Sequence, residues 1–451
     1  MELRAVETLL TEHKITKIKV GGFDIDGILR GKYISREKFD SAAEKGLGFC
    51  DVIFGWDSSD VLYDNVSVTG WHTGYPDAVA RIDLSSFRLI PWEPGTAFFL
   101  INYFDEQGRP LSISPREVLR RVVERAHKMG FDPQVATEFE FFLFREDSHS
   151  IRAKHYRDLT PLSPGMFGYS VMRTGVHWEL AHAILDSMHD FGIELEGFHT
   201  ETGPGVYETA IRHDHGLAAA DKAALFKSGL KQVAARHGLI ATFMAKWNAD
   251  LPGASGHLHE SLWDHDHAEN LFYDTKAPKG ISDLMRHYVA GQLNLMPELT
   301  AFACPTVNSY KRLVPGVWAP TNATWGIDNR TVALRVVLGP SPQAVRVEYR
   351  LSGADINPYL AIAASLAAGL YGIEHRLEPP EPVSGNAYEV NAPQLPRSLD
   401  EATQLLDHSA VAGELLGEEF VDHYLRTRQW EERQHRRAVT NWELERYFEI
   451  I

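Results

Sequence analysis

Cysteine is scarce in this sequence of 451 residues, which contains only Cys50 and Cys304. Two cysteines cannot build the disulfide framework of a small secreted protein, and they suit a reducing cytoplasm. The first residues, "MELRAVETLLTEHK", form a charged amphipathic pattern without the apolar core of a signal peptide. The sequence therefore predicts a cytoplasmic protein.

Long hydrophobic runs and an excess of positive charge are also missing. The most apolar stretch, residues 360–373, is too short and too rich in alanine to cross a membrane, so it predicts a buried helix. The formal net charge is −16, and an acidic surface disfavours nucleic acids and anionic lipids. We therefore expect neither a nucleic-acid partner nor a membrane partner.

Two common nucleotide-binding signatures are absent as well. The chain has no Gly-x-x-x-x-Gly-Lys loop, which excludes a P-loop enzyme, and no Gly-x-Gly-x-x-Gly fingerprint of a Rossmann domain. It also has no internal repeat. What remains is an ordinary globular composition, 44% apolar and 24% charged, on a chain long enough for two domains.

Turn signals divide the chain near residue 110. Alternating residues on both sides of Asp26-Gly27 predict a β-hairpin in the first part. We therefore predict a small β-rich domain over residues 1–110 and a larger α+β domain over residues 111–451. In the larger domain we expect strands near residues 135–144, 203–211, 256–263, 331–338 and 344–351, and helices near residues 115–129, 174–190, 216–236, 281–295 and 356–373.

The first helix of the larger domain has clear boundary signals. Ser114 precedes Pro115, which suits the first helical position, and Glu117 follows the serine by three residues. This spacing predicts a capping box, in which the serine and glutamate side chains bond to each other's backbone amides. Gly130 marks the end of the helix.

The strand "VATEFEFFLF" contains two acids among aromatic residues. Side chains alternate along a strand, so Glu138 and Glu140 share one face while Phe139 and Phe141 share the other, which is typical of a core. Two unpaired carboxylates on a buried face would cost several kcal/mol each. A metal ion between them would remove this cost, whereas a solvated strand face is the simpler alternative.

Other segments supply more metal ligands. Glu201 and Glu208 bracket a Gly-Pro-Gly bend that can turn both carboxylates toward one point. His257 and His259 share a strand face, and so do Arg346, Glu348 and Arg350. An oxygen-rich set with imidazole favours Mg²⁺ or Mn²⁺, and arginines beside such an ion suggest phosphate chemistry. Structural histidines and a solvated Arg-Glu-Arg ladder are the alternatives. The histidines of residues 265–270 are expected on a surface loop, with a metal site there as the disfavoured alternative.

Three longer motifs resemble the glutamine synthetase family: "NSYKRLVPG" (308–316), "DNRTVALRV" (328–336) and "RVEYRLSGADINPYLAIAASLAAGL" (346–370). With the acid and histidine strands, the resemblance covers nearly the whole chain in the family's order. It implies an α+β fold, with a small N-terminal β-grasp domain and a C-terminal catalytic domain that has a curved antiparallel sheet. It also implies a homo-oligomeric double ring, such as a dodecamer, with each active site at a subunit boundary.

The resemblance also implies roles for individual residues. One divalent cation, Mg²⁺ or Mn²⁺, would be held by Glu140, Glu201 and Glu208, and a second by Glu138, His257 and Glu348. The glutamate substrate would contact Arg312, Arg350 and Gly253. Arg330 would stabilise the transferred phosphoryl group, and the nucleotide ATP would contact Arg335, Arg346, His259 and Ser261. The implied reaction transfers the γ-phosphoryl group of ATP to the side-chain carboxylate of L-glutamate, after which an amine displaces phosphate.

The chain departs from the family pattern in one loop. Ammonia-using members have a glutamate two residues after the glycine of "RLVPG", where this chain has Trp318. Indole cannot take a proton or neutralise a cation. A second ammonium-site acid is kept as Asp57, and Val206 replaces a common glutamine without an assigned consequence. We therefore predict a ligase for an organic amine, with a true glutamine synthetase that uses ammonia as the alternative.

Two further alternatives are disfavoured. A silent structural relative would be expected to lose metal ligands or Arg330, and a guanidino kinase would lack "NSYKRLVPG". The identity of the amine stays open. Asp57 could deprotonate an alkylamine or polyamine, and an aromatic amine could instead stack on Trp318.

Overall fold

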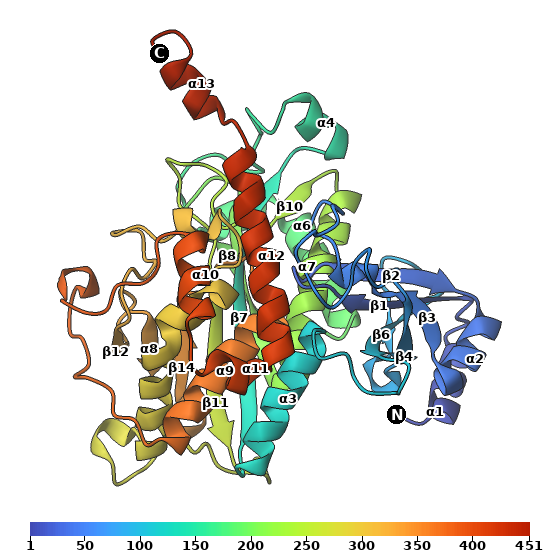
Figure 1. The fold of residues 1–451 in the computed structure, drawn as a ribbon, viewed down its shortest axis with the longest axis horizontal. Helices are drawn as coiled ribbons and strands as arrows, with labels where there is room; N and C mark the ends of the chain where they lie inside the picture. Colours follow the sequence, from blue (N-terminus) through green and yellow to red (C-terminus); the bar gives the residue numbers. More distant parts are fainter.

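The structure, a computed structural model, describes residues 1–451 and contains two β-sheets. The first sheet has the order β2-β1-β6-β4-β3, with β5 beside β6. Figure 1 shows it in blue at one side of the molecule. Its elements are α1 (Leu3–Glu12), β1 (Lys17–Phe23), β2 (Leu29–Ile34), α2 (Arg36–Lys45), β3 (Leu47–Cys50), β4 (Asp77–Ile82), β5 (Arg88–Leu89) and β6 (Thr96–Phe104).

The second sheet has eight strands, in the order β12-β13-β14-β11-β7-β9-β8 with β10 beside β7. All its pairings are antiparallel except β12 with β13. The α+β class and the antiparallel catalytic sheet are therefore confirmed. The strands are β7 (Asp132–Phe144), β8 (Leu195–Thr200), β9 (Val206–His215), β10 (Ile240–Thr242), β11 (Gly256–Trp263), β12 (Trp325–Ile327), β13 (Leu334–Val337) and β14 (Arg346–Tyr349).

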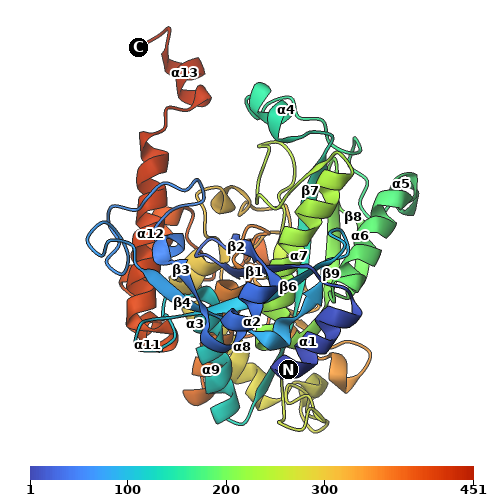
Figure 2. The ribbon, with the colours of Figure 1, turned by 90° about the vertical axis from the view of Figure 1, so that its right-hand side faces the viewer.

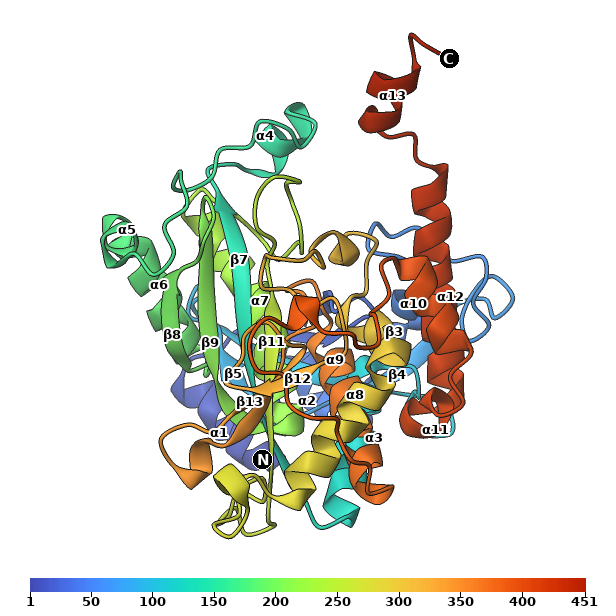
Figure 3. The ribbon, with the colours of Figure 1, turned by 90° about the vertical axis from the view of Figure 1, so that its left-hand side faces the viewer.

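Helices pack around this second sheet. Helix α7 lies against β7, β9 and β10 (Figure 2), and α8 packs lengthwise on α9 (Figure 3). Helix α13 extends away from the body of the molecule (Figure 1). The helices are α3 (Pro115–Lys128), α4 (Ser148–Ala153), α5 (Val171–Val176), α6 (Trp178–Asp190), α7 (Gly216–Arg236), α8 (Asp283–Ala303), α9 (Pro358–Glu374), α10 (Leu399–Asp407), α11 (Ala412–Leu416), α12 (Glu418–Arg437) and α13 (Asn441–Tyr447).

The central strand β7 shows how packing leaves its acids free for the site. Phe139 and Phe141 are fully buried and pack against Phe226 of α7 and against Phe243. Burying such a side chain contributes roughly 1.5–3 kcal/mol to the stability of the fold, so this face of the strand is fixed toward the core. The alternation then turns Glu138 and Glu140 to the other face of the sheet.

Arg116 of α3 connects the two sheets through a buried ionic cluster. Its guanidinium lies 2.8 Å from Asp83, which follows β4, and 2.8 Å from Asp221 of α7. It also donates to Asn102 of β6 over 2.7 Å. Burial alone would lower the pKa of Arg116, but the charges of Asp221 and Asp83 raise it above its ordinary value. The guanidinium is therefore held charged between elements of both sheets.

The predictions for turns and helix ends were mostly correct. The hairpin turn at Gly27 has φ 74°, and Gly130 after α3 has φ 90°. The capping box at Ser114 was wrong, since this serine precedes α3 without a side-chain bond to the helix. Glu117 instead pairs with Arg120 at 2.6 Å, one turn further along the same helix.

Two expectations concern the whole chain. Helix α9 is buried along almost its full length, as its composition predicted. Both cysteines are free, and no helix combines the length and apolar character that a membrane crossing requires.

Candidate active site

Four neighbouring strands of the second sheet bring acids and histidines together. Because β9, β7, β11 and β14 lie side by side, residues from distant parts of the sequence become direct neighbours across the strands. The register pairs Glu140 with Glu208, Glu138 with His257, and His259 with Glu348.

These side chains line a cavity of about 970 Å³, which shares lining residues with cavities of about 370 Å³ and 300 Å³. Every predicted site residue except Asp57 lines at least one of the three. The large cavity is lined by Glu138, Glu140, Glu201, Glu208, His257, His259, Trp318, Arg330, Arg335, Arg346, Glu348 and Arg350. Arg312 and Gly253 line the 300 Å³ cavity, and Ser261 lines the 370 Å³ cavity.

One ligand cluster lies at the ends of β8 and β9. His199, Glu201 and Glu208 bring one ligand atom each within 4.8 Å of the others, and His199 Nε2 lies 3.6 Å from Glu201 and 3.7 Å from Glu208. His199 was not predicted from the sequence, although its spacing of two from Glu201 was a usable signal. Glu140 does not belong to this cluster, but it faces the same cavity and accepts a hydrogen bond from the amide of Ser255.

The second ligand cluster lies on β7, β11 and β14 and consists of Glu138, His259 and Glu348. His259 Nε2 lies 3.2 Å from Glu138, and His257 Nδ1 lies 3.2 Å from Glu348 and 3.7 Å from Glu138. Both imidazoles therefore approach Glu138. The division of roles between them, one for a cation and one for the nucleotide, stays a prediction.

The electrostatics of the two clusters differ. Burial, followed by the charges of Glu140 and Glu138, raises the pKa of Glu208 above its ordinary value. Burial also acts to raise the pKa of Glu138. The charges and hydrogen bonds of His259 and His257 outweigh it, so the pKa of Glu138 is lowered. The carboxylates around Glu208 thus lack a compensating charge of their own. A divalent cation would supply it, and oxygen-rich donors are those that Mg²⁺ and Mn²⁺ prefer.

Arginines surround the clusters from β13 and β14. Arg335 lies 3.0 Å from Glu348, and Arg350 pairs with the same carboxylate. Arg346 donates through Nε to His259 Nδ1 over 3.1 Å. Arg335 also lies 3.3 Å from Asp328, whereas Arg346 has no carboxylate partner and lines the cavity beside Arg330. Such planar donors are suited to phosphate and carboxylate groups.

The loop after "RLVPG" forms one wall of the site. Trp318 lines both the large and the 300 Å³ cavities, is 66% exposed and has φ 64°. Val317 and the buried Val206 line the 300 Å³ cavity with it. Tyr388 donates a hydrogen bond to the carbonyl of Ala319 over 3.0 Å and so ties the loop to the following segment. No acid of this loop reaches the cavity.

Comparisons with known proteins now decide the family. A family model described as the glutamine synthetase catalytic domain matches residues 112–447. The chain belongs to the glutamine synthetase family. A Dictyostelium discoideum relative named type-1 glutamine synthetase 2 is 51% identical over 100% of this chain and 87% of its own.

Two further relatives of this glutamine synthetase family member are named for other amines. The glutamate–isopropylamine ligase of a Pseudomonas species is 41% identical over 100% of this chain and 98% of its own. The gamma-glutamylethanolamide synthetase of Streptomyces coelicolor is 41% identical over 94% of this chain and 91% of its own. A solved GmaS–ADP complex superposes with a TM-score of 0.86 at 29% identity, over 98% of this chain and 99% of the other.

Asp57 is the one predicted site residue of this family member that lies outside the cavities. Its carboxylate accepts a hydrogen bond from the Trp430 indole over 3.0 Å and bonds from the amides of Ser59 and Val61. Within one chain it therefore packs against α12. Its predicted catalytic role requires a site shared between two chains and stays a prediction.

Proposed function

We propose that this protein is an ATP-dependent ligase that joins the γ-carboxylate of L-glutamate to an organic amine through γ-glutamyl phosphate. The observation that carries the proposal is the wall formed by Trp318 and Val317, because the loop offers indole and aliphatic surface where ammonia-using members have a carboxylate. Apolar surface suits the carbon skeleton of an amine. The isopropylamine and ethanolamide names of two relatives fit the same reaction class.

The acid clusters would hold two divalent cations, Mg²⁺ or Mn²⁺. One would use Glu201 and Glu208 with Glu140 or His199, and the other would use Glu138 and Glu348 with His257 or His259. When bound, such ions neutralise phosphate charge and align the reacting oxygens. Burial and the neighbouring carboxylates raise the pKa of Glu208, and this supports the assignment because a divalent cation would relieve the repulsion among these groups.

The chain's own arginines would carry the remaining charge. Arg312, which is 4% exposed in the 300 Å³ cavity, and Arg350 would bind and orient L-glutamate beside Gly253. Arg335 and Arg346 would bind the phosphates of ATP, with Ser261 in the cavity for the sugar and base. Arg330 would stabilise the phosphoryl group in transfer.

The atoms balance over two steps. The bond between the β–γ bridging oxygen and the γ-phosphorus breaks, and a carboxylate oxygen of L-glutamate forms the new bond to phosphorus, giving ADP and an acyl phosphate. The amine nitrogen then attacks the acyl carbon, and phosphate leaves with the carboxylate oxygen. The nitrogen loses a proton, for which Asp57 of a neighbouring subunit is the proposed acceptor.

A second candidate function is glutamine synthesis with ammonia. The observation in its favour is the type-1 glutamine synthetase name of the 51% identical relative. The two functions share every step except the nucleophile. They are therefore distinguished only by whether ammonia or an organic amine gives the higher kcat/KM.

The deciding experiment is ATP-dependent phosphate release with L-glutamate, Mg²⁺ and a panel of amines. The panel contains ammonium, ethanolamine, isopropylamine, putrescine, spermine and aniline, and the control reactions omit L-glutamate or the amine. We expect kcat/KM for at least one organic amine to exceed that for ammonium, with the γ-glutamyl amide identified by mass. If ammonium gives the highest value, the protein is a glutamine synthetase.

We also propose the arrangement that the family implies for the whole molecule. A domain boundary near residue 110, a homo-oligomeric double ring and a cytoplasmic location are parts of this proposal. The position of Asp57 outside the three cavities of its own chain supports a shared site. Electron microscopy of the purified protein would show the ring and count its subunits.

A further inference from the structure

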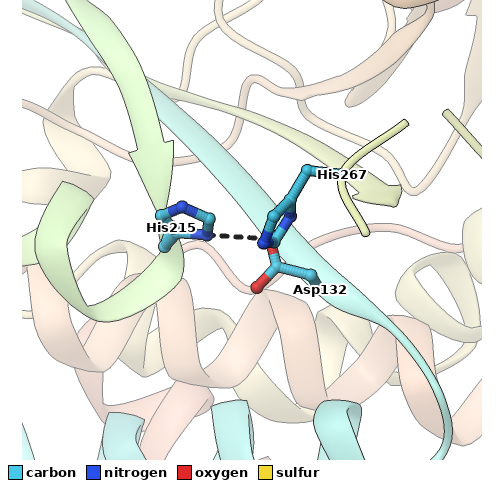
Figure 4. Close-up of side chains that lie close together, drawn as sticks. All are labelled: Asp132, His215 and His267. Carbon is cyan, nitrogen blue, oxygen red and sulfur yellow. Dashed lines mark hydrogen bonds and ion pairs between the residues drawn. The ribbon is translucent and has the colours of Figure 1, made fainter. Parts of the chain in front are cut away.

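A second group of histidines gathers around one buried carboxylate that does not line any of the three active-site cavities. Asp132, the first residue of β7, is only 5% exposed. Its Oδ2 atom lies 2.9 Å from His215 Nδ1 and 3.0 Å from His267 Nδ1. On the other side, His127 Nε2 lies 3.2 Å from Oδ1. Figure 4 shows the imidazoles of His215 and His267 beside the carboxylate.

The three ligands come from separate parts of the chain. Asp132 begins β7, His215 ends β9 at the start of α7, and His267 belongs to the surface loop that follows β11. One ligand atom of each lies within 4.8 Å of the other two. Both histidines are about half exposed, so an ion from solvent can reach the buried carboxylate between them.

The hydrogen bonds of this cluster cannot all be satisfied at once. His215 Nδ1 lies 2.9 Å from Asp132 Oδ2, which only accepts, and 3.0 Å from Gln134 Nε2, which only donates. One ring nitrogen cannot donate and accept together. Turning the Gln134 amide does not help, because its oxygen would then face the Asp132 carboxylate. A cation would use the nitrogen lone pair and the carboxylate charge at the same time.

We propose that Asp132, His215 and His267 bind a divalent transition-metal ion of the zinc type. Two imidazoles and one carboxylate are a frequent protein ligand set for zinc, with a fourth position for water. The active-site clusters are richer in carboxylates and suit harder ions. The two kinds of site should therefore be separable by the choice of metal.

The position of this site suggests what the ion would do. Gln134, which contacts both Asp132 and His215, also lines the 370 Å³ cavity next to Ser261 and Arg346. A bound ion would connect the loop of residues 264–270 to β7 and to the start of α7, beside the Gln134 wall of that cavity. The ion would thus hold the loop in one place without taking part in the reaction.

The test is a Zn²⁺ titration of the metal-stripped full-length protein in excess Mg²⁺, followed by competition with a coloured chelator. We expect one Zn²⁺ per chain that Mg²⁺ does not displace. His215→Ala and His267→Ala should each weaken its binding by at least roughly 100-fold, because each removes a direct ligand and loss of an outer-shell partner alone costs about 10- to 100-fold. The control is His408→Ala, which removes an exposed histidine after α10 and should leave Zn²⁺ binding unchanged.

A spectroscopic arm keeps the result independent of activity. Co²⁺ in place of Zn²⁺ should give visible absorption bands that are lost in His267→Ala, a variant on an exposed loop that should retain amide synthesis. Two outcomes would overturn the proposal. Either the protein retains no Zn²⁺ at micromolar concentration in excess Mg²⁺, or both histidine variants bind Zn²⁺ and Co²⁺ as the unchanged protein does.

Discussion

Replacing Trp318 with glutamate tests whether this loop sets the preference for the amine. The side chain is 66% exposed and its backbone has φ 64°, so the indole contributes little to packing and the exchange adds no new backbone strain. Trp318→Gln is the matched control, because glutamine has the shape of glutamate without its charge. Both variants remove the indole, and only one adds a carboxylate.

The expected magnitude follows from the position of the side chain. A carboxylate about 4 Å from an ammonium ion gains about 4 kcal/mol at an effective dielectric constant of about 20, and about 1 kcal/mol in water. Because the position is more than half exposed, we expect a value near the lower end, about 1–2 kcal/mol. This corresponds to an increase of roughly 5- to 30-fold in kcat/KM for ammonium over the glutamine variant.

The assay is phosphate release with ammonium and with the best organic amine for all three proteins. We expect kcat/KM for ammonium to rise in Trp318→Glu but not in Trp318→Gln. The value for the organic amine should fall in both variants, since its carbon skeleton loses the indole surface. The gain should shrink at high salt, which screens an exposed charge. Equal ammonium values for the two variants would refute the argument.

Two further predictions concern stability. Arg116→Met should lower the free energy of unfolding by about 3 kcal/mol in denaturant titrations, because the buried Asp221 and the half-buried Asp83 lose the cation that pairs with both, although Asp221 keeps its hydrogen bond from the Tyr359 hydroxyl; a loss below about 1 kcal/mol would contradict this. Burial lowers the pKa of His423 to about 4, whereas the unfolded chain has the ordinary value of about 6.5. Between these two pH values His423 is protonated in the unfolded chain and neutral in the folded chain. Stability should therefore fall as the pH falls through this window, by about 2 kcal/mol from pH 7 to pH 5, and this contribution should vanish in His423→Gln. An identical pH slope in both proteins would show that His423 is not its source.

Local patterns in the sequence were enough to place the longer helices and strands up to α9 and to choose the faces of the strands, whereas β8, β10, β12 and the helices after α9 were not predicted. The alternation of Glu138 and Glu140 with Phe139 and Phe141 determines which face is apolar, because successive side chains on a strand point to opposite sides. The Gly-Pro-Gly bend brings Glu201 and Glu208 together, because glycine and proline fix the direction in which the chain turns. These features depend on residues close together in the chain, so the spacing of those residues in the sequence is enough to predict them.

Only the tertiary structure decided which side chains meet across the sheet. His259 approaches Glu138 as closely as His257 approaches Glu348, and His199 joins Glu201 and Glu208, because strand register brings distant segments together. The predicted capping box did not form, because the Ser114 side chain makes no bond to the helix and Glu117 pairs with Arg120. The sequence showed the histidines of residues 265–270 but not their partners, since the ligands at Asp132 come from three segments that only the packing of β7, β9 and the loop after β11 makes neighbours.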